Sequence, residues 1–328
     1  MAAGSLMFGI YPLHVAGTPF GVADGPADDY EKIRSALADL RGARSLNSRT
    51  YLVYTRAWEA KTLAKVAEYA ENGLLGDVVV GCGDWTAQTE QQIEMENWLK
   101  FISLVIRRHG AEISSVQITN EPNLSFMEGS KAYIYEALTQ GVLAAKEEIV
   151  KAGFPIEVGF GSVPHSPVAV ADFWERLAQA ADEAFLRSVD FVGHNFYVDV
   201  FEEEPVAIGQ IPAVVDSILS ALRTRMSELG LPPTVPIRVT ENGWPTGINP
   251  VTSRVRSAEQ QSKVLETIIR AISDQRQNHN VSHYSLFGLR DADSSNDSLF
   301  HQYGILRDDY TTKPAYSSFR TLIHELGA

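Results

Sequence analysis

The chain has 328 residues, 45% of them apolar, which is enough to bury a large core and fits one large barrel or two ordinary domains. Its net charge of −13 argues against a surface for nucleic acid or an anionic membrane, because phosphate contacts need clustered Lys and Arg. The single cysteine, Cys82, excludes an internal disulfide and a Cys-rich zinc site. We expect Cys82 to be a buried strand residue.

The N-terminal segment has no basic stretch followed by a long apolar one, and no uncharged stretch is long enough to cross a bilayer. The sequence as given therefore predicts a cytoplasmic protein outside the membrane, or a secreted one if a signal has been removed. No metal or cofactor is expected. His-x-His and His-Glu-x-x-His patterns are absent, and Gly81-Cys-Gly83 lacks the third glycine of a dinucleotide turn.

Short apolar or β-branched runs alternate with long amphipathic ones from the beginning of the chain to its end. The amphipathic stretches repeat apolar residues at spacings of three and four, as in 63–70, 134–149 and 264–272, and predict helices. Turn formers such as Asn72-Gly73 and Ala152-Gly153 separate the helices from the next strand. Strands are expected over residues 6–11, 50–54, 77–81, 114–120, 157–161, 191–197, 237–241 and 282–288.

This alternation predicts parallel strands joined by right-handed crossovers, and therefore the α/β class. Eight units in 328 residues match the size of a closed (β/α)8 TIM barrel. An open doubly wound sheet is the alternative, but it would normally carry a Gly-rich phosphate turn after an early strand. No linker, repeat or low-complexity segment interrupts the pattern, so we predict a single domain over residues 1–328.

Two of the expected strands stop at a glutamate that is followed at once by turn-forming residues. They are Ile118-Thr-Asn-Glu-Pro-Asn123 and Arg238-Val-Thr-Glu-Asn-Gly-Trp-Pro245. In a (β/α)8 barrel the C-terminal strand ends all face one pocket, so Glu121 and Glu241 would converge there. Glycosidic bonds are broken by two carboxyl groups, one protonating the leaving oxygen and the other attacking the sugar or activating water. A salt bridge at the barrel mouth would explain one such glutamate better than two.

The runs Thr119-Asn-Glu-Pro122 and Val239-Thr-Glu-Asn-Gly243 resemble the acid/base and nucleophile signatures of retaining glycoside hydrolases of clan A, with motifs similar to those of families 1, 5 and 39. The resemblance implies cleavage of a β-glycosidic bond by double displacement, with Glu121 as acid/base on the fourth strand and Glu241 as nucleophile on the seventh. It also implies that Asn120 holds the sugar 2-hydroxyl. No single family fits throughout.

Three further residues are candidates for the site. The segment from Asp190 to Tyr197 is similar to the sixth strand of clan members, whose tyrosine hydrogen-bonds the nucleophile, and the resemblance gives Tyr197 that role. A core aromatic is the alternative. Arg56 ends the second strand and is the candidate cation beside Glu241, with a salt bridge between helix and loop as the alternative. His194 could donate to sugar hydroxyls or serve as a structural group.

Aromatic side chains near strand ends could stack against the apolar face of a sugar. Trp58, Trp85 and Trp244 follow the second, third and seventh strands, and we favour Trp244, three residues beyond Glu241. On the eighth strand many clan members have a tryptophan under the sugar. This chain has Phe287 near that position, and we expect it to take the place of that tryptophan.

The predicted partner is a β-linked oligosaccharide, polysaccharide or glycoside. A transglycosylase that uses the same covalent intermediate stays open as an alternative, as does a sugar-binding barrel without hydrolytic activity, although the latter usually lacks a catalytic carboxylate. A Schiff-base aldolase would need a lysine inside the barrel, whereas every lysine here falls in an expected helix or its flanks. The sugar, the linkage, internal or terminal cleavage and the oligomeric state are left open.

Overall fold

The structure is a computed structural model that describes residues 5–18, 21–83, 91–202, 204–249 and 252–328. The internal contacts of the chain divide it into two compact units. The first contains residues 1–48, 196–220 and 239–328, and the second contains residues 49–195 and 221–238. The predicted single domain stays a prediction.

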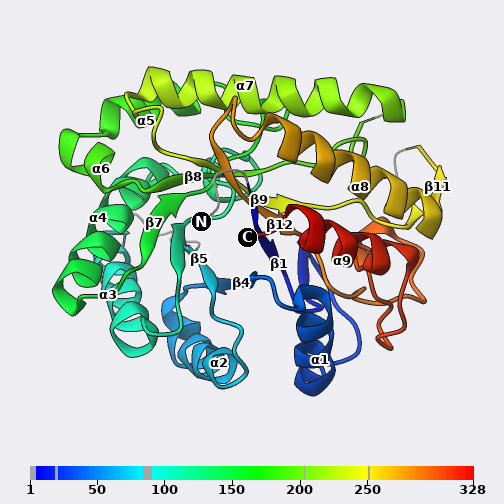
Figure 1. The fold of residues 1–328 in the computed structure, drawn as a ribbon. Coiled ribbons are helices and arrows are strands. Elements are labelled where there is room, and N and C mark those ends of the chain that lie inside the picture. The colour runs from blue at the N-terminus through cyan, green and yellow to red at the C-terminus, as the bar shows by residue number, and fades with distance from the viewer. Residues whose placement is uncertain (1–4, 19–20, 84–90, 203, 250–251) are drawn as a thin grey trace. The chain divides into compact units, whose positions relative to one another are not determined.

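Eight parallel strands among the described residues close into a barrel in the order β1-β12-β9-β8-β7-β6-β5-β4 (Figure 1). The predicted fold class, an α/β (β/α)8 barrel, is therefore confirmed. Each of the eight predicted strands corresponds to one of them. The barrel strands are β1 (Met7–Ile10), β4 (Leu46–Val53), β5 (Asp77–Gly81), β6 (Ser115–Ile118), β7 (Glu157–Phe160), β8 (Phe191–Asn195), β9 (Ile237–Asn242) and β12 (Val281–Leu286).

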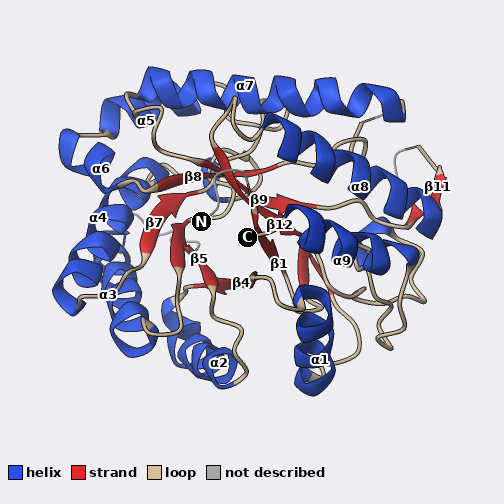
Figure 2. Cartoon of the chain, viewed as in Figure 1, coloured by secondary structure: helices blue, strands red, loops and turns tan. Residues whose placement is uncertain are grey.

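Helices alternate with these strands along the chain (Figure 2). In the described part of the chain, two antiparallel hairpins lie outside the barrel, β2 (Ala16–Thr18) with β3 (Gly21–Ala23), and β10 (Gly247–Ile248) with β11 (Val255–Arg256). Strands of two or three residues are too short to show an alternating pattern, so the sequence did not predict them. The helices are α1 (Tyr30–Arg41), α2 (Glu59–Glu71), α3 (Gln91–His109), α4 (Ile134–Ala152), α5 (Phe173–Ala180), α6 (Glu183–Ser188), α7 (Ile211–Leu229), α8 (Ala258–Gln275) and α9 (Pro314–Leu326).

Local sequence sets where several helices begin and end. The Asp29 carboxylate accepts hydrogen bonds from the first-turn amides of α1, which have no partner within the helix. Ser257 and Gln260 form a reciprocal capping box at the start of α8. Helix α4 ends at Gly153, whose φ of 72° lies in the left-handed region that glycine enters without steric cost. These caps fix the ends of helices that connect the barrel strands.

Strand β4 begins at Leu46, whereas the sequence predicted a start at residue 50. The prediction missed the first residues of the strand because they are mostly polar. Arg49 is 1% exposed, and its guanidinium donates to the Asp77 carboxylate at 2.5 Å and to Gln117 Oε1 at 2.9 Å. A charged side chain tolerates such burial when it is paired and hydrogen-bonded. An apolar run therefore underestimates the length of a strand whose polar side chains are buried in a hydrogen-bonded network.

A second buried ion pair joins the loop after β12 to the residue before α9. Lys313 Nζ lies 2.7 Å from Asp291 Oδ1 and 3.0 Å from Thr246 Oγ1, and both charged side chains are almost fully buried. Burial raises the pKa of Asp291 and lowers the pKa of Lys313, while their mutual attraction opposes both shifts. Each of the two buried charges is therefore stabilised by the other, and removal of one partner would leave the other uncompensated.

We predict that Lys313→Ala lowers the free energy of unfolding by about 3–5 kcal/mol, because Asp291 is then left as an uncompensated buried carboxyl group. Chemical denaturation of the wild type and the variant measures the difference. Lys32→Ala is the matched control, since Lys32 lies at the surface, where it forms an exposed pair with Asp29 at 4.0 Å and lies 5.1 Å from the ring centroid of Tyr310, and it should cost less than about 1 kcal/mol. Equal losses in the two variants would contradict this account of the pair.

Candidate active site

Glu121 follows the end of β6 in the second unit. Strand β6 pairs in parallel with β5 and β7, so that Ile118 lies opposite Val80 on one side and Phe160 on the other. The next residue, Thr119, donates its amide to Val80 O at 3.0 Å and has a φ of 61°. A left-handed conformation is strained for a threonine and persists only where the surroundings enforce it. The chain therefore turns away from extended geometry at Thr119, just before Asn120 and Glu121.

The amide of Asn195, at the end of β8, contacts both residues of this turn. Its Nδ2 lies 3.1 Å from Glu121 Oε1 and 3.1 Å from Asn120 Oδ1. A donor at this distance fixes the direction of the Glu121 carboxyl group. Sequence reasoning missed Asn195. The available signal was its place two residues before Tyr197 in the run used for the sixth strand.

Close packing fixes the backbone of the same turn. The Nε2 group of Gln117 donates to Thr119 O at 2.8 Å. On the neighbouring strand end, a Cβ atom added to Gly161 would lie 2.0 Å from Asn120 O and 2.6 Å from Gln117 Nε2. Any side chain at position 161 would displace the turn, so a glycine is required here for close approach.

Glu241 stands at the end of β9 in the first unit and is 9% exposed. Tyr197 donates its phenolic hydrogen to Glu241 Oε1, which is the hydrogen bond that the resemblance led us to expect. The Glu241 carbonyl accepts from the amide of Phe196 at 3.0 Å, and Asn242 Nδ2 donates to Phe196 O at 2.8 Å. Asn242 is held in turn by the hydroxyl of Tyr284 at 2.9 Å. The catalytic roles of Glu241 and Tyr197 stay predictions.

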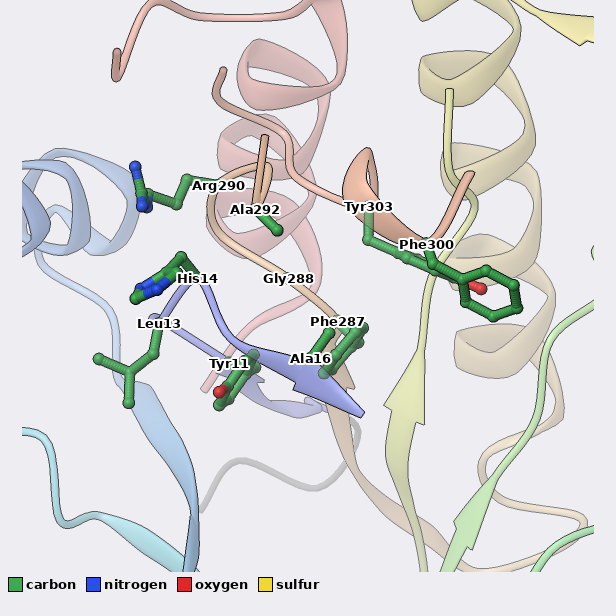
Figure 3. A pocket seen from close by; sticks show the side chains of 10 residues that line it. All are labelled: Tyr11, Leu13, His14, Ala16, Phe287, Gly288, Arg290, Ala292, Phe300 and Tyr303. Carbon is green, nitrogen blue, oxygen red and sulfur yellow. The ribbon is translucent and has the colours of Figure 1, made fainter. Parts of the chain in front are cut away.

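Aromatic rings continue from Tyr197 through the first unit. Tyr303 packs edge-on against Tyr197, with centroids 5.6 Å apart, and against Phe287 at 5.5 Å. Phe287 also stacks on Tyr11, with centroids 5.0 Å apart and ring planes within 6°. Figure 3 shows Tyr11, Phe287 and Tyr303 among the side chains that line a pocket, whose volume is about 10 Å³. That volume is close to the minimum for one water, so the pocket does not hold a sugar ring.

The structure gives a different exposed aromatic from the one that we favoured. Trp244 is 3% exposed, and the Arg256 guanidinium lies 4.8 Å from its ring centroid, so it presents no open platform. Phe201 is 52% exposed and packs edge-on against Tyr197 at 5.6 Å. Phe201 is therefore the better candidate for contact with a sugar face in this unit. Trp85 lies outside the described residues.

Arg56 lies in the second unit, in the 3-10 helix η1 (Arg56–Trp58) after β4, and its side chain is mostly exposed. Its guanidinium lies 3.6 Å from Glu94 Oε1 on α3, which is the salt bridge between helix and loop that we gave as the alternative. A role beside Glu241 stays a prediction.

His194 is buried in β8 of the second unit, with its Nδ1 2.8 Å from Ser162 Oγ. The Ser162 hydroxyl donates to Gly193 O at 2.7 Å, so the imidazole Nδ1 carries the hydrogen that donates to Ser162. Burial lowers the pKa of His194 to about 3. These features favour the structural alternative, and contact between His194 and a sugar stays a prediction.

Within the described ranges, no group of three or more His, Cys, Asp or Glu side chains is arranged to hold a metal ion. In the same part of the chain, no helix combines the length and the apolar character needed to cross a bilayer.

Comparison with known proteins found similarity in structure only. No protein-family model matches the chain, and no curated protein sequence matches it. A glycoside hydrolase family 17 β-1,3-glucanosyltransferase from Rhizomucor miehei is 17% identical, with a TM-score of 0.56, and the alignment covers 94% of this chain and 96% of that one. A family 39 glycoside hydrolase from Bacteroides cellulosilyticus WH2 is 17% identical, with a TM-score of 0.62 and coverage of 99% and 64%. A β-glucosidase named 1317 is 16% identical, with a TM-score of 0.60 and coverage of 91% and 89%. At these identities the comparisons establish the barrel fold.

We predict that the His194 ring stays neutral from pH 8 down to about pH 4, because burial disfavours the imidazolium. Its folded-state pKa lies below the unfolded value of about 6.5, so only the unfolded chain binds this proton in between. The stability that depends on neutral His194 is therefore lost as the pH falls from about 6.5 toward 3. Nitrogen-15 NMR of the imidazoles tests this, with exposed His165 as the reference ring. Protonation of His194 near pH 6 would contradict the prediction.

Proposed function

We propose that this chain is a retaining glycoside hydrolase that cleaves a β-glycosidic bond, with Glu121 as acid/base and Glu241 as nucleophile. One observation carries the proposal. Asn195 and Tyr197 are two positions apart in the chain, and each donates a hydrogen bond to one of the two glutamates. Both glutamates also stand at or just beyond the carboxyl ends of parallel strands, where active sites of this barrel fold are built.

The proposed reaction has two steps. In the first, a Glu241 oxygen attacks the anomeric carbon while Glu121 gives its proton to the leaving oxygen, so the glycosidic bond breaks and a glycosyl ester forms. In the second, Glu121 takes a proton from water as the water oxygen attacks the same carbon, and Glu241 leaves as a carboxylate. The Tyr197 hydroxyl orients the Glu241 carboxylate, and Asn120 is placed beside the acid/base to hold the sugar 2-hydroxyl.

The structural neighbours guide the choice of substrate. Their names describe a β-1,3-glucanosyltransferase, a β-glucosidase and a family 39 glycoside hydrolase. We therefore propose β-linked glucosides as the first class to assay, as aryl β-glucosides and as β-1,3-linked glucan oligosaccharides. Proton NMR of the first product distinguishes the mechanisms, because double displacement yields the β-anomer and a single displacement yields the α-anomer. An α-configured first product would exclude the assignment of Glu241 as nucleophile.

The glucanosyltransferase among the neighbours makes sugar transfer the second candidate function. A transglycosylase forms the same glycosyl ester on Glu241 and passes it to a sugar hydroxyl in place of water. Chromatography of the products formed from a β-1,3-linked oligosaccharide separates the two activities. Products longer than the substrate indicate transfer, whereas accumulation of shorter products alone indicates hydrolysis.

We predict that replacement of the two glutamates by alanine has different effects. Glu241→Ala should lower kcat/KM by several orders of magnitude on all aryl β-glucosides, and azide should occupy the vacated space and yield an α-glucosyl azide. Glu121→Ala should retain kcat/KM on 2,4-dinitrophenyl β-glucoside, whose leaving group needs no proton, and azide should yield the β-glucosyl azide. The measurements are steady-state kinetics and NMR of the azide products. If both variants lose activity equally on good and poor leaving groups, the two roles are wrongly assigned.

We predict that Tyr197→Phe lowers kcat/KM by roughly 100-fold, because the Glu241 carboxylate loses the donor that orients it. Tyr316→Phe is the matched control, since its hydroxyl bonds Asp39 at 2.8 Å elsewhere in the same unit. The control should keep the turnover of the wild type per folded molecule, although it loses a hydrogen bond. Equal turnover in Tyr197→Phe and Tyr316→Phe would show that the tyrosine beside Glu241 has no catalytic effect.

A further inference from the structure

One carboxyl group beside the acid/base turn has no part in the mechanism above. Glu128 begins the 3-10 helix η2 (Glu128–Ser130) in the loop between β6 and α4. Its Oε2 accepts the backbone amide of Asn120 at 3.0 Å, and its Oε1 accepts the backbone amide of Cys82 at 3.0 Å. The residue as a whole keeps some exposure, but its carboxyl group is turned inward onto the ends of β5 and β6.

The loop is folded so that Glu128 can reach this position. The amide of Leu124 donates to Glu121 O at 3.0 Å and turns the chain back on itself. A Cβ atom added to Gly129 would lie 2.6 Å from Leu124 O and 2.7 Å from Pro122 O, so the loop packs against its own beginning. The contact between Glu128 and Asn120 therefore belongs to a compact loop and does not depend on an extended side chain in solvent.

Both amides that Glu128 binds follow the last residues of their strands. The final ladder bond between β5 and β6 runs from Thr119 N to Val80 O at 3.0 Å. Because Thr119 has a positive φ, the next amide, that of Asn120, leaves the ladder direction. A buried amide without an acceptor costs about 1–3 kcal/mol, and both oxygens of a carboxyl group can accept from such an amide, whether the group is ionised or protonated. The Glu128 carboxyl group thus supplies the acceptor that a neighbouring strand would otherwise offer to the amide of Asn120, the residue before Glu121.

The opposite side of the same peptide is also held. Gln117 Nε2 donates to Thr119 O at 2.8 Å, and its Oε1 accepts from Arg49, which pairs with Asp77. Two side chains from different segments therefore fix the strained backbone, Glu128 through an N–H group and Gln117 through a carbonyl. Strain of this kind persists where several contacts enforce it.

We propose that Glu128 is a positioning residue for the acid/base, which holds the backbone of Asn120 so that Glu121 protonates the leaving oxygen in the correct direction. The inference rests on the proposed function, because it assigns Glu128 an effect through Glu121. Glu128 has no contact with substrate in this role. Its effect is confined to the step that needs the Glu121 proton.

The raised pKa of Glu128 agrees with its buried position. Burial raises the pKa of Glu128 to about 7, although the two backbone amides and the Cys82 thiol act in the opposite direction. The titratable group that faces it from β5 is Cys82, whose own pKa is raised by burial and by Glu128, and lowered slightly by Lys131 of the same loop. The end of β6 contributes the amide of Asn120.

The test compares Glu128→Gln with the wild type on two substrates, phenyl β-glucoside and 2,4-dinitrophenyl β-glucoside. Glutamine has the same shape, but it offers one acceptor oxygen to two amides and places its NH2 group against the other. Because a displacement of about 1 Å can cost 100-fold in rate, kcat/KM on the phenyl glucoside should fall roughly 10-fold to 100-fold. On the dinitrophenyl glucoside it should stay within about threefold, since that leaving group needs no proton. Activity on the dinitrophenyl substrate also shows that the variant is folded.

Glu136→Gln is the matched control, an exposed glutamate on α4 in the same unit, and it should match the wild type on both substrates. An equal fall on both substrates, or no fall on either, in Glu128→Gln overturns the inference. Glu121→Ala separates this failure from failure of the proposed function. If Glu121→Ala shows the leaving-group difference and Glu128→Gln does not, only the role of Glu128 is wrong. If Glu121→Ala shows no such difference, the proposed function itself fails.

A second measurement does not depend on activity. Between about pH 4.5 and 7 the folded chain keeps the Glu128 proton while the unfolded chain has lost it, so this group makes stability fall as the pH rises across that window. The thermal midpoint of the wild type should therefore decline more over this range than that of Glu128→Gln, which cannot titrate. Parallel curves for the two proteins would show that burial does not raise the pKa of Glu128, so that its carboxyl group is not enclosed at the ends of β5 and β6, and would overturn the inference.

Discussion

Every amide and carbonyl at the end of a parallel strand needs a partner once the neighbouring strand has stopped, and this requirement organises the site. At the end of β6 the amide of Asn120 donates to the carboxyl group of Glu128. After β8 the carbonyl of Phe196 accepts a hydrogen bond from the side chain of Asn242, and the amide of Phe196 donates to the Glu241 carbonyl. Both proposed catalytic glutamates are within one residue of such a bond. Their directions are therefore consequences of how strand ends satisfy their hydrogen bonds.

The sequence was sufficient for the fold because each barrel strand contains an apolar run bounded by turn formers. The sequence was less informative about the ends of strands whose buried side chains are polar. Strand β4 extends back to Leu46 because Arg49 is buried with Asp77 and Gln117, and none of these residues marks a strand by hydropathy. Glu121 and Glu241 were predictable for a related reason, since a glutamate directly between an apolar strand and a turn is visible in the chain order alone.

The remaining site residues depend on contacts that chain order does not reveal. Asn195 reaches Glu121 across 74 positions, and Glu128 reaches Cys82 across 46. The exposure of aromatic side chains is also hidden from the sequence. Trp244 has the right residue type near the right strand end, but Arg256 covers its ring, and Phe201 takes the exposed place. Residue type near a strand end can be read from sequence, whereas exposure is decided by which other segments pack there.

The close approach of Gly161 to Asn120 restricts how this protein can diverge. The two residues belong to different strand ends, yet the carbonyl of one occupies the space that a side chain of the other would need. In relatives, a larger residue at position 161 would have to be accompanied by a different backbone path after β6. The glycine at 161 and the left-handed backbone at Thr119 are therefore coupled, since a change at either position would alter the backbone path that carries Glu121.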